Sequence, residues 1–326
     1  MITRLQFIKV LALSCVAVLS TAAFAQAWPS KPVRIVVPFA AGGPADSLAR
    51  FIGTRMANDL GQPVVIDNKA GAGGTFGASE VIRSNDGHSF LFSSTGALSI
   101  VPSLMTNLSY NPERDLTAVA YAVTTPSVIV VSAKSPFNTL ADLVKFAKLN
   151  PGKLNFADGG VGTMSNLVVS MLASRAGIEV AQISHKGNAP AMLAVMAGHA
   201  DAMIEPPNTY VPQIKAGKLR AIATTALVEL EYLPGVPPVA KDYSGFDGTI
   251  WFGIYAPKGT PRAAIDKLHQ TYMTVIKEPA MRKRMLDSGM QLLAEADYST
   301  DAFQNFTANE IEKYREVIRA AKIEPQ

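Results

Sequence analysis

The stretch Ile35–Arg50, "IVVPFAAGGPADSLAR", decides the fold because it joins a strand to a helix through a bare corner. An apolar segment typical of a buried strand runs into Pro38, and the small residues 40–43 follow it. Beyond them, apolar side chains recur at helical spacing as far as Leu60. Glycine in such a corner allows another molecule to approach the backbone closely. The stretch therefore predicts a strand, a corner open to a ligand, and a helix.

The same unit recurs along the chain. Further strands are predicted at "QPVVIDN" (62–68), "HSFLFSS" (88–94), "KLNFA" (153–157), "VAQIS" (180–184), "ADAMIE" (200–205), "LRAIATT" (219–225) and "TIWFGIYAP" (249–257). Helices are predicted at 136–150, from 164 to the stop at Gly177, and at 190–197, 261–277, 279–288 and 300–321. Strands that alternate with helices indicate an α/β fold with parallel sheets.

The composition limits the function. The chain has 326 residues, of which 48% are hydrophobic, so it can bury a large core and two domains are expected. Arg4 and Lys9 precede an apolar run that ends in A-x-A, which predicts a signal peptide over residues 1–27 with cleavage after Ala25 or Ala27. The remaining chain has 28 basic and 26 acidic side chains. This charge is too small to suggest nucleic-acid binding, and the one cysteine, Cys15, lies in the leader.

The corners after the strands are the candidate binding elements. A helix N-terminus has unpaired N–H groups and a partial positive charge, so it attracts anions. In the first corner, Gly43 is the predicted N-cap and Asp46 the third helical residue. In "GGVGTMSN" (159–166), glycines clear the approach, and hydroxyl and amide side chains follow. The corners "SSTGALS" (93–99) and "HKGNAP" (185–190) have a similar character.

These corners predict a cradle for a small anion, because the carboxyl ends of parallel strands form the ligand crevice of a sheet. Tight packing is the alternative explanation for any one glycine-rich corner. Asp46 has two interpretations: it orients a polar group of a ligand, or it only stabilises its own helix through the dipole.

The sequence gives little support to catalysis. His88, His185, His199 and His269 lack metal-site spacing, and no nucleophile elbow or P-loop occurs. "GAGGTFG" (71–77) and "GGVGTMS" (159–165) nearly match the dinucleotide fingerprint, but Phe76 and Ser165 replace its third glycine. A dinucleotide-dependent oxidoreductase stays open as an alternative. The favoured prediction is a binding protein without enzymatic activity, cofactor or metal.

Taken in order, these segments resemble the substrate-binding proteins of tripartite tricarboxylate transporters, the Bug-type periplasmic receptors. The resemblance is carried by "WPSKPVRIVVPFAAGGPAD", "LGQPVVIDNKAGAGGTFGA", "NPGKLNFADGGVGTMSNL", "HKGNAPAMLAVMAGHADAMIE" and "WFGIYAPKGTP". It implies a periplasmic-binding-protein (Venus flytrap) fold with two α/β domains around a central cleft, joined by crossing strands. Domain 1 would comprise residues 28–125 and 249–326, and domain 2 residues 126–248.

The resemblance also implies a ligand and partners. The ligand would be a small organic carboxylate, held by backbone N–H groups, hydroxyls and water, and delivered to membrane subunits of such a transporter. We expect a periplasmic monomer, with signalling in place of uptake as the alternative. The ligand-binding residues, from the resemblance and the corners, would be Phe39, Ala40, Ala41, Gly42, Asp46, Ser94, Thr95, Gly160, Gly162, Thr163, Ser165, Asn166 and Glu205.

Four positions depart from the common family pattern. Ala41 stands in place of proline, Asn166 in place of histidine, His185 in place of tyrosine and Glu205 in place of aspartate. These departures leave the identity of the carboxylate open. Glu205 is a candidate for contact with an amino or hydroxyl group of the ligand, or else a solvated loop acid.

Overall fold

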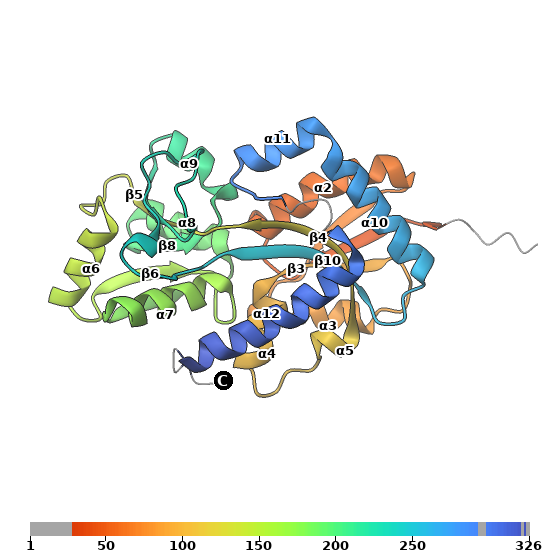
Figure 1. Ribbon diagram of the computed structural model, residues 1–326, viewed down its shortest axis with the longest axis horizontal. Coiled ribbons are helices and arrows are strands. Elements are labelled where there is room, and N and C mark those ends of the chain that lie inside the picture. Colours follow the sequence, from red (N-terminus) through yellow and green to blue (C-terminus); the bar gives the residue numbers. More distant parts are fainter. Residues whose placement is uncertain (1–27, 293–297, 321–322, 324–326) are drawn as a thin grey trace, which may run out of the picture.

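The computed structural model describes residues 28–292, 298–320 and 323. The predicted signal peptide, residues 1–27, lies outside this part. The described chain forms two lobes, each built on one mixed five-stranded sheet with helices packed against it (Figure 1). The predicted two-domain α/β architecture is confirmed.

The sheet of the first lobe has the strand order β2-β1-β3-β10-β4. Its strands are β1 (Val33–Val37), β2 (Val64–Asn68), β3 (Ser89–Ser94), β4 (Leu116–Thr125) and β10 (Ile250–Pro257). Strands β1, β2 and β3 are parallel, whereas β10 runs antiparallel to both β3 and β4. Its longer helices are α2 (Pro44–Leu60), α3 (Thr75–Arg83), α10 (Arg262–Lys277), α11 (Pro279–Asp287) and α12 (Thr300–Ala320). Shorter turns are a 3₁₀ helix (Ala72–Gly74), a π-helix (Gly96–Ile100), α4 (Val101–Leu104) and α5 (Pro112–Asp115).

The sheet of the second lobe has the order β7-β6-β8-β5-β9. Its strands are β5 (Val128–Ser132), β6 (Leu154–Asp158), β7 (Val180–Ser184), β8 (Ala202–Glu205) and β9 (Leu219–Thr224). Strand β5 is antiparallel to β8 and β9, and β6 is parallel to β7 and β8. The helices are α6 (Leu140–Leu149), α7 (Met164–Ala176), α8 (Asn188–Ala197) and α9 (Val211–Lys215), with 3₁₀ turns at Pro207–Thr209 and Val239–Lys241.

The structure corrects three details of the sequence prediction. The sheets are mixed, because β5 and β10 run against their neighbours. Strands β4 and β5 were not predicted. They lie in one apolar run that is interrupted only near Pro126, and such a run lacks the alternation of polar and apolar residues that indicates a strand. Two helix starts were misplaced: α8 begins at Asn188, before Pro190, and α6 begins after its capping residue Thr139.

Two chain segments cross between the lobes and are hydrogen-bonded to each other. Strand β4 leads through Ser127 into β5, and the chain returns after β9 to β10. The Ser127 N–H donates to Thr225 Oγ1 and the Thr225 N–H donates to the Ser127 carbonyl, both at 2.8 Å. The Ser127 hydroxyl donates to the Gly248 carbonyl at 3.0 Å. Hydrogen bonds therefore hold the two crossing segments together, and Figure 1 shows β4 and β10 side by side across the middle of the molecule.

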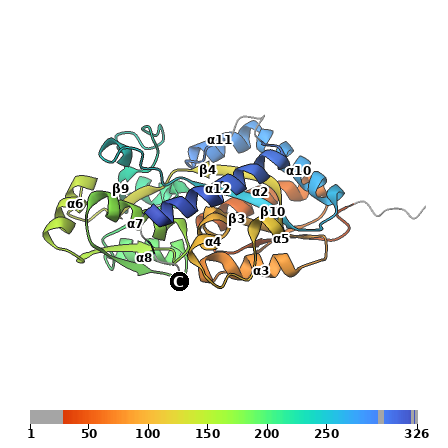
Figure 2. The same ribbon diagram turned by 60° about the horizontal axis from the view of Figure 1, so that its bottom comes forward.

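Helix α12 is anchored on β10, the strand that leads out of this crossing. Gly253 lets the helix approach the strand, and Phe303 lies directly above it. The Trp251 indole N–H donates to Glu310 at 3.1 Å. The Tyr255 and Thr307 hydroxyls are 2.6 Å apart. Figure 2 shows α12 lying across the first lobe. The C-terminal helix thus holds in place a strand whose first residues reach the cleft.

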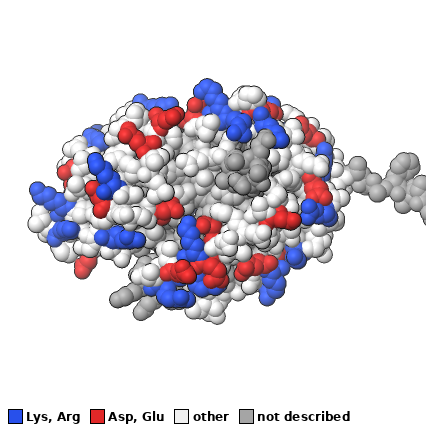
Figure 3. Space-filling view, viewed as in Figure 1, with Lys and Arg blue, Asp and Glu red and all other residues white. Residues whose placement is uncertain are grey.

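The outer surface carries no strong charge bias on the face seen in Figure 3, where basic and acidic side chains of the described residues are interspersed. None of the helices that the structure describes is both long and apolar enough to cross a membrane.

Gly253→Ala should lower the free energy of unfolding by about 1–3 kcal/mol, the usual cost of overpacking a core. An added Cβ would lie 2.1 Å from Phe303 Cζ and 3.1 Å from the Ala120 carbonyl oxygen. Urea denaturation followed by circular dichroism measures the change. Adding Phe303→Leu should restore part of the loss because the shorter side chain vacates that space. Unchanged stability of Gly253→Ala would contradict the close packing of α12 on β10.

Candidate ligand-binding cleft

The carboxyl ends of strands from both sheets face one another and enclose a small chamber. From the first lobe, the corner after β1 and the end of β3 reach it, and from the second lobe the ends of β6, β7 and β8 do. Its volume is about 40 Å³, enough for a few water-sized groups. The lining residues are Phe39, Ala40, Gly43, Pro44, Ala45, Ser94, Gly159, Thr163, Met164, Ser165, Gly187, Asn188, Glu205, Pro206, Ile250 and Phe252.

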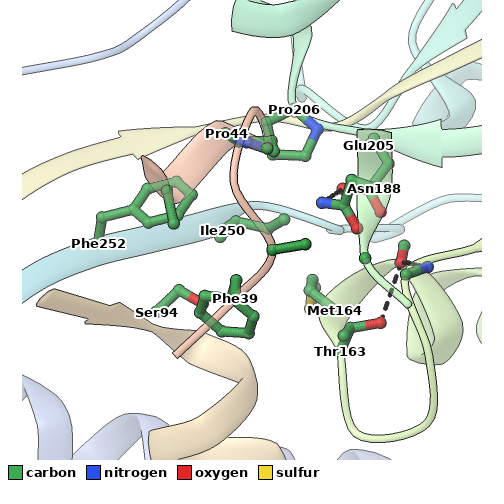
Figure 4. Close-up of a pocket in the computed structure, with 16 residues that line it drawn as sticks. Phe39, Pro44, Ser94, Thr163, Met164, Asn188, Glu205, Pro206, Ile250 and Phe252 are labelled. Atoms are coloured by element: carbon green, nitrogen blue, oxygen red, sulfur yellow. Dashed lines mark hydrogen bonds between the residues drawn. The ribbon is translucent and has the colours of Figure 1, made fainter. Parts of the chain in front are cut away.

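Figure 4 shows how the chamber is walled. Phe39, Ser94 and Phe252 lie on the side of the first lobe, and Thr163, Asn188 and Glu205 lie on the side of the second. A larger vestibule of about 480 Å³ shares Phe39 and Thr163 with the chamber and opens toward His185 and Lys186. The chamber and vestibule form one cleft between the lobes.

Two helices point uncapped N-termini at the chamber. Helix α2 begins after Gly43 and helix α8 after Gly187, and glycine has no side chain that could cap the first turn. The first N–H groups of a helix have no partner within it. In α2 these belong to Ala45 and Asp46, since Pro44 has none, and in α8 to Asn188 and Ala189. Both ends can donate hydrogen bonds to an anion in the chamber.

Helix α7 differs because its own hydroxyls cap it. Thr163 is its N-cap and accepts from the Asn166 N–H, and its hydroxyl donates to the Gly160 carbonyl at 2.6 Å. The Ser165 hydroxyl accepts from the Gly159 N–H at 3.0 Å and contacts the Thr163 hydroxyl. These bonds hold the corner after β6 in shape. This cap occupies only the Asn166 N–H of α7, whereas α2 and α8 have no side-chain cap and provide one open helix end from each lobe.

Glu205 is a buried acid at the end of β8, with 1% of its surface exposed. Its Oε2 accepts from the Asn188 side-chain amide at 2.6 Å. Its Oε1 is buried and has no hydrogen-bond partner among the described residues. The solvated loop position considered from the sequence is therefore wrong. Burial raises the pKa of Glu205 from 4.5 to about 8, the charge of Asp158 adds to the rise, and Ser165 and Asn188 oppose it.

The two lobes are in contact at glycines, where an added side chain would collide with the opposite lobe. A Cβ on Gly187 would lie 2.7 Å from the Ala40 Cβ, and one on Gly162 would lie 2.7 Å from Val101 Cγ2. A Cβ on Gly96 would lie 2.9 Å from the Gly162 carbonyl oxygen. Glycine at these positions thus permits the lobes to meet.

Residues 48–323 match the family described as "Tripartite tricarboxylate transporter family receptor". The chain belongs to this receptor family. It is similar to a UPF0065 protein in the tcbD-tcbE intergenic region of Pseudomonas sp. strain P51, with 37% identity over 86% of this chain and 84% of that protein.

The chain is also similar to solved structures of binding proteins. The periplasmic binding protein BugD is 35% identical, with a TM-score of 0.87 over 92% of the receptor and 100% of BugD. MatC from Rhodopseudomonas palustris, solved with bound malate, is 29% identical, with a TM-score of 0.84 over 89% and 100%. The R. palustris protein Rpa4515, solved with adipate, is 27% identical, with a TM-score of 0.87 over 92% and 100%.

About half of the residues predicted from the sequence line the cleft of this receptor. The chamber contains Phe39, Ala40, Ser94, Thr163, Ser165 and Glu205, and the vestibule contains Gly160. The predicted residues outside both linings are Ala41, Gly42, Asp46, Thr95, Gly162 and Asn166.

Those six residues have other contacts in the structure, and their ligand-binding role stays a prediction. Ala41 and Gly42 are exposed, and a Cβ on Gly42 would meet the Ala189 Cβ at 3.8 Å. Asp46 accepts from the Gly42 N–H at 2.9 Å and pairs with Arg50 at 2.9 Å. Although burial opposes it, these partners lower the pKa of Asp46. These contacts of Asp46 are of the kind that stabilises the corner between β1 and α2.

Thr95 and Asn166 are held within their own lobes. The Thr95 hydroxyl accepts from the Trp251 N–H at 3.1 Å. The Asn166 amide donates to Asp158 at 3.0 Å and to Gln182 at 2.6 Å. Gly162 lies against Val101 of the other lobe, so it serves the lobe contact rather than the chamber.

Sequence reasoning missed several lining residues. Gly187 and Asn188 belong to "HKGNAP", a corner identified as a candidate but left out of the final set. The feature of the sequence that could have identified this corner is the glycine before α8. A glycine N-cap leaves the helix end open, whereas a threonine caps α7. Ile250 and Phe252 come from β10, the antiparallel strand, and a strand pattern alone does not place them in a cleft.

Gly162→Ala should hold the lobes farther apart without unfolding either, because its Cβ would collide with Val101. Since Cys15 lies in the leader, cysteines introduced at the exposed positions Arg83 and Leu193 place one spin label in each lobe. Pulsed electron paramagnetic resonance should show a longer distance than in wild type.

Gly198→Ala is the matched control for this variant. Gly198 has a φ of +79°, close to +83° at Gly162, but a Cβ there would meet no described atom within 4 Å. Both variants carry similar backbone strain, of order 1–3 kcal/mol. Equal label distances in the two variants would contradict the proposed role of Gly162 in lobe contact.

Glu205→Gln should change how stability depends on pH. The folded receptor keeps the Glu205 proton up to about pH 8, whereas an ordinary glutamate releases it near 4.5. The stability that this proton supplies is complete below pH 4.5 and is lost as the pH rises to about 8. Glutamine has no such loss, so the free energy of unfolding of the variant relative to wild type should increase across this window, by on the order of 5 kcal/mol.

Denaturation curves at several pH values measure this difference. Glu179→Gln, the same change at an exposed site, should follow the wild-type pH dependence. A Glu205→Gln difference that is independent of pH would contradict a buried, neutral Glu205.

Proposed function

We propose that the protein is a periplasmic receptor that captures a small organic carboxylate in the cleft and delivers it to membrane subunits of a tripartite tricarboxylate-type transporter. The observation that carries this proposal is the pair of uncapped helix N-termini, α2 and α8, that meet in one chamber. Together they offer N–H donors and two partial positive charges to an anion. The chamber lining contains no Lys, Arg or His among the described residues, so the backbone is its main source of positive potential.

Related proteins support the ligand class. MatC was solved with malate and Rpa4515 with adipate, both of which are small dicarboxylates. The chamber and the vestibule adjoin and share lining residues, which supports a ligand with one end in the chamber and the rest in the vestibule. The family description supports the transporter as partner.

The remaining parts of the proposal concern location and organisation. The basic and apolar leader supports export to the periplasm, where BugD is described as a binding protein. We propose the domain limits 28–125 with 249–326, and 126–248, around the crossing at Ser127 and Thr225. We also propose a monomer that acts without a cofactor or metal and catalyses no reaction. A receptor that serves a signalling partner would use the same cleft.

A thermal-shift screen of the protein purified from the periplasm tests the function. Malate, adipate and other small carboxylates form the panel, and NAD tests the dinucleotide alternative. A ligand at 100 times its dissociation constant should stabilise the fold by about 2.7 kcal/mol. Stabilisation by NAD, with none by any carboxylate, would overturn the proposal.

Gly159→Ala links that stabilisation to the chamber. A Cβ at Gly159 would lie 2.0 Å from Asn188 Oδ1, so it would displace the side chain that bonds Glu205 and disturb the start of α8. We expect the carboxylate-induced shift to disappear in this variant and to persist in Gly198→Ala. A full shift in folded Gly159→Ala would place the carboxylate outside this chamber.

A further inference from the structure

Glu205 gives the chamber a feature that the open helix ends do not explain. A site for an anion is lined by a carboxyl group and, among the described residues, by no cationic side chain. An ionised Glu205 would repel the ligand across a space of about 40 Å³. Either the Glu205 carboxyl group is neutral when the ligand binds, or the ligand presents a hydrogen-bond donor to it.

The hydrogen bonds of Glu205 distinguish its two oxygens. Oε2 accepts from the Asn188 amide at 2.6 Å, while Oε1 is buried and has no partner among the described residues. The Ser165 hydroxyl, which lies close enough to Glu205 to oppose the rise of its pKa, is bonded to the Gly159 N–H and to Thr163. Glu205 and Gly159 both line the chamber, and Oε1 lies beside Gly159, since a Cβ there would be 3.5 Å from it. A proton on Oε1 would leave the Asn188 bond intact and would turn the free oxygen into a donor.

We propose that Glu205 is protonated when the cleft takes a carboxylate, and that its Oε1 hydroxyl donates a hydrogen bond to the ligand in place of a cationic side chain. This inference rests on the proposed function. It replaces the earlier expectation that Glu205 accepts from an amino or hydroxyl group of the ligand. The ligand and one proton then bind together.

The surrounding charges favour this state. At the end of β6, Asp158 is fully buried, and its carboxylate adds negative potential at Glu205. His185 and Lys186, in the corner between β7 and α8, line the vestibule rather than the chamber. From the first lobe, α2 brings Asp46, which is paired with Arg50.

The other elements packed against β8 are neutral here. The first turn of α7 presents Ser165 and Asn166, and β5 begins with Val128. Burial and repulsion by Asp158 together hold the proton on Glu205 to about pH 8.

The first arm of the test uses no ligand. Infrared difference spectra between wild type and Glu205→Gln, from pH 5 to pH 10, report the protonated carboxyl of this one residue. Glu179→Gln serves as the control for an exposed glutamate. We expect the Glu205 signal to disappear with a midpoint near pH 8. A midpoint below pH 6 would overturn the inference, whatever the ligand proves to be.

The second arm measures the affinity for malate and for adipate by calorimetry at pH 7 and pH 9. Wild-type affinity should fall about tenfold between these values, because ligand and proton bind together. Glu205→Gln, which offers an N–H donor at the same place, should keep wild-type affinity at pH 7 within a few fold and lose the pH dependence. Affinity that rises with pH, or a loss of a hundredfold in Glu205→Gln at pH 7, would show an ionised acceptor and overturn the inference.

The two arms separate this inference from the proposed function. If no carboxylate of the panel binds while Glu205 still titrates near pH 8, the proposed function fails and the donor role fails with it. If carboxylates bind but Glu205 titrates like an ordinary glutamate, only the inference fails.

Discussion

The proposed function places one electrostatic constraint on the structure: an anion would be held in a small chamber whose lining, among the described residues, has no cationic side chain. Helix N-termini can bind an anion under this constraint, because their N–H groups are fixed in direction and carry partial positive charge without a counter-ion of their own. Two of them that lie at the chamber, one from each lobe, begin after a glycine and have no capping side chain. Because residues of both lobes line the chamber, a bound anion would contact both lobes.

The remaining architecture serves to bring these two helix ends together. Parallel strands direct their carboxyl ends, and hence the following helix starts, to one edge of each sheet. The paired segments at Ser127 and Thr225 fix where the two edges meet. Glycines 162 and 187 let the lobes approach until their backbones touch. Helix α12 in turn holds β10, which contributes Phe252 to the wall.

The sequence predicted the fold and part of the site, for physical reasons that differ between residues. The corner at Gly43 was predictable because strand, glycine and helix are contiguous in the sequence. The cap formed by Thr163 was not predicted, because a hydroxyl beside a glycine corner can meet a ligand or cap its own helix, and the local pattern is the same in both cases. The burial of Glu205 and the approach of Ile250 and Phe252 arise from contacts between distant segments, which local patterns do not contain.

Backbone amide chemical shifts during a malate titration test the central claim most directly, because they report on the N–H groups themselves. If the two helix ends hold the ligand, the amide signals of Ala45 and Asp46 in α2 and of Asn188 and Ala189 in α8 should shift together, with one shared dissociation constant. The amides of Ser165 and Asn166, at the capped start of α7, should shift less. Shifts confined to one lobe, or centred on the first turn of α7, would contradict capture by two facing helix ends.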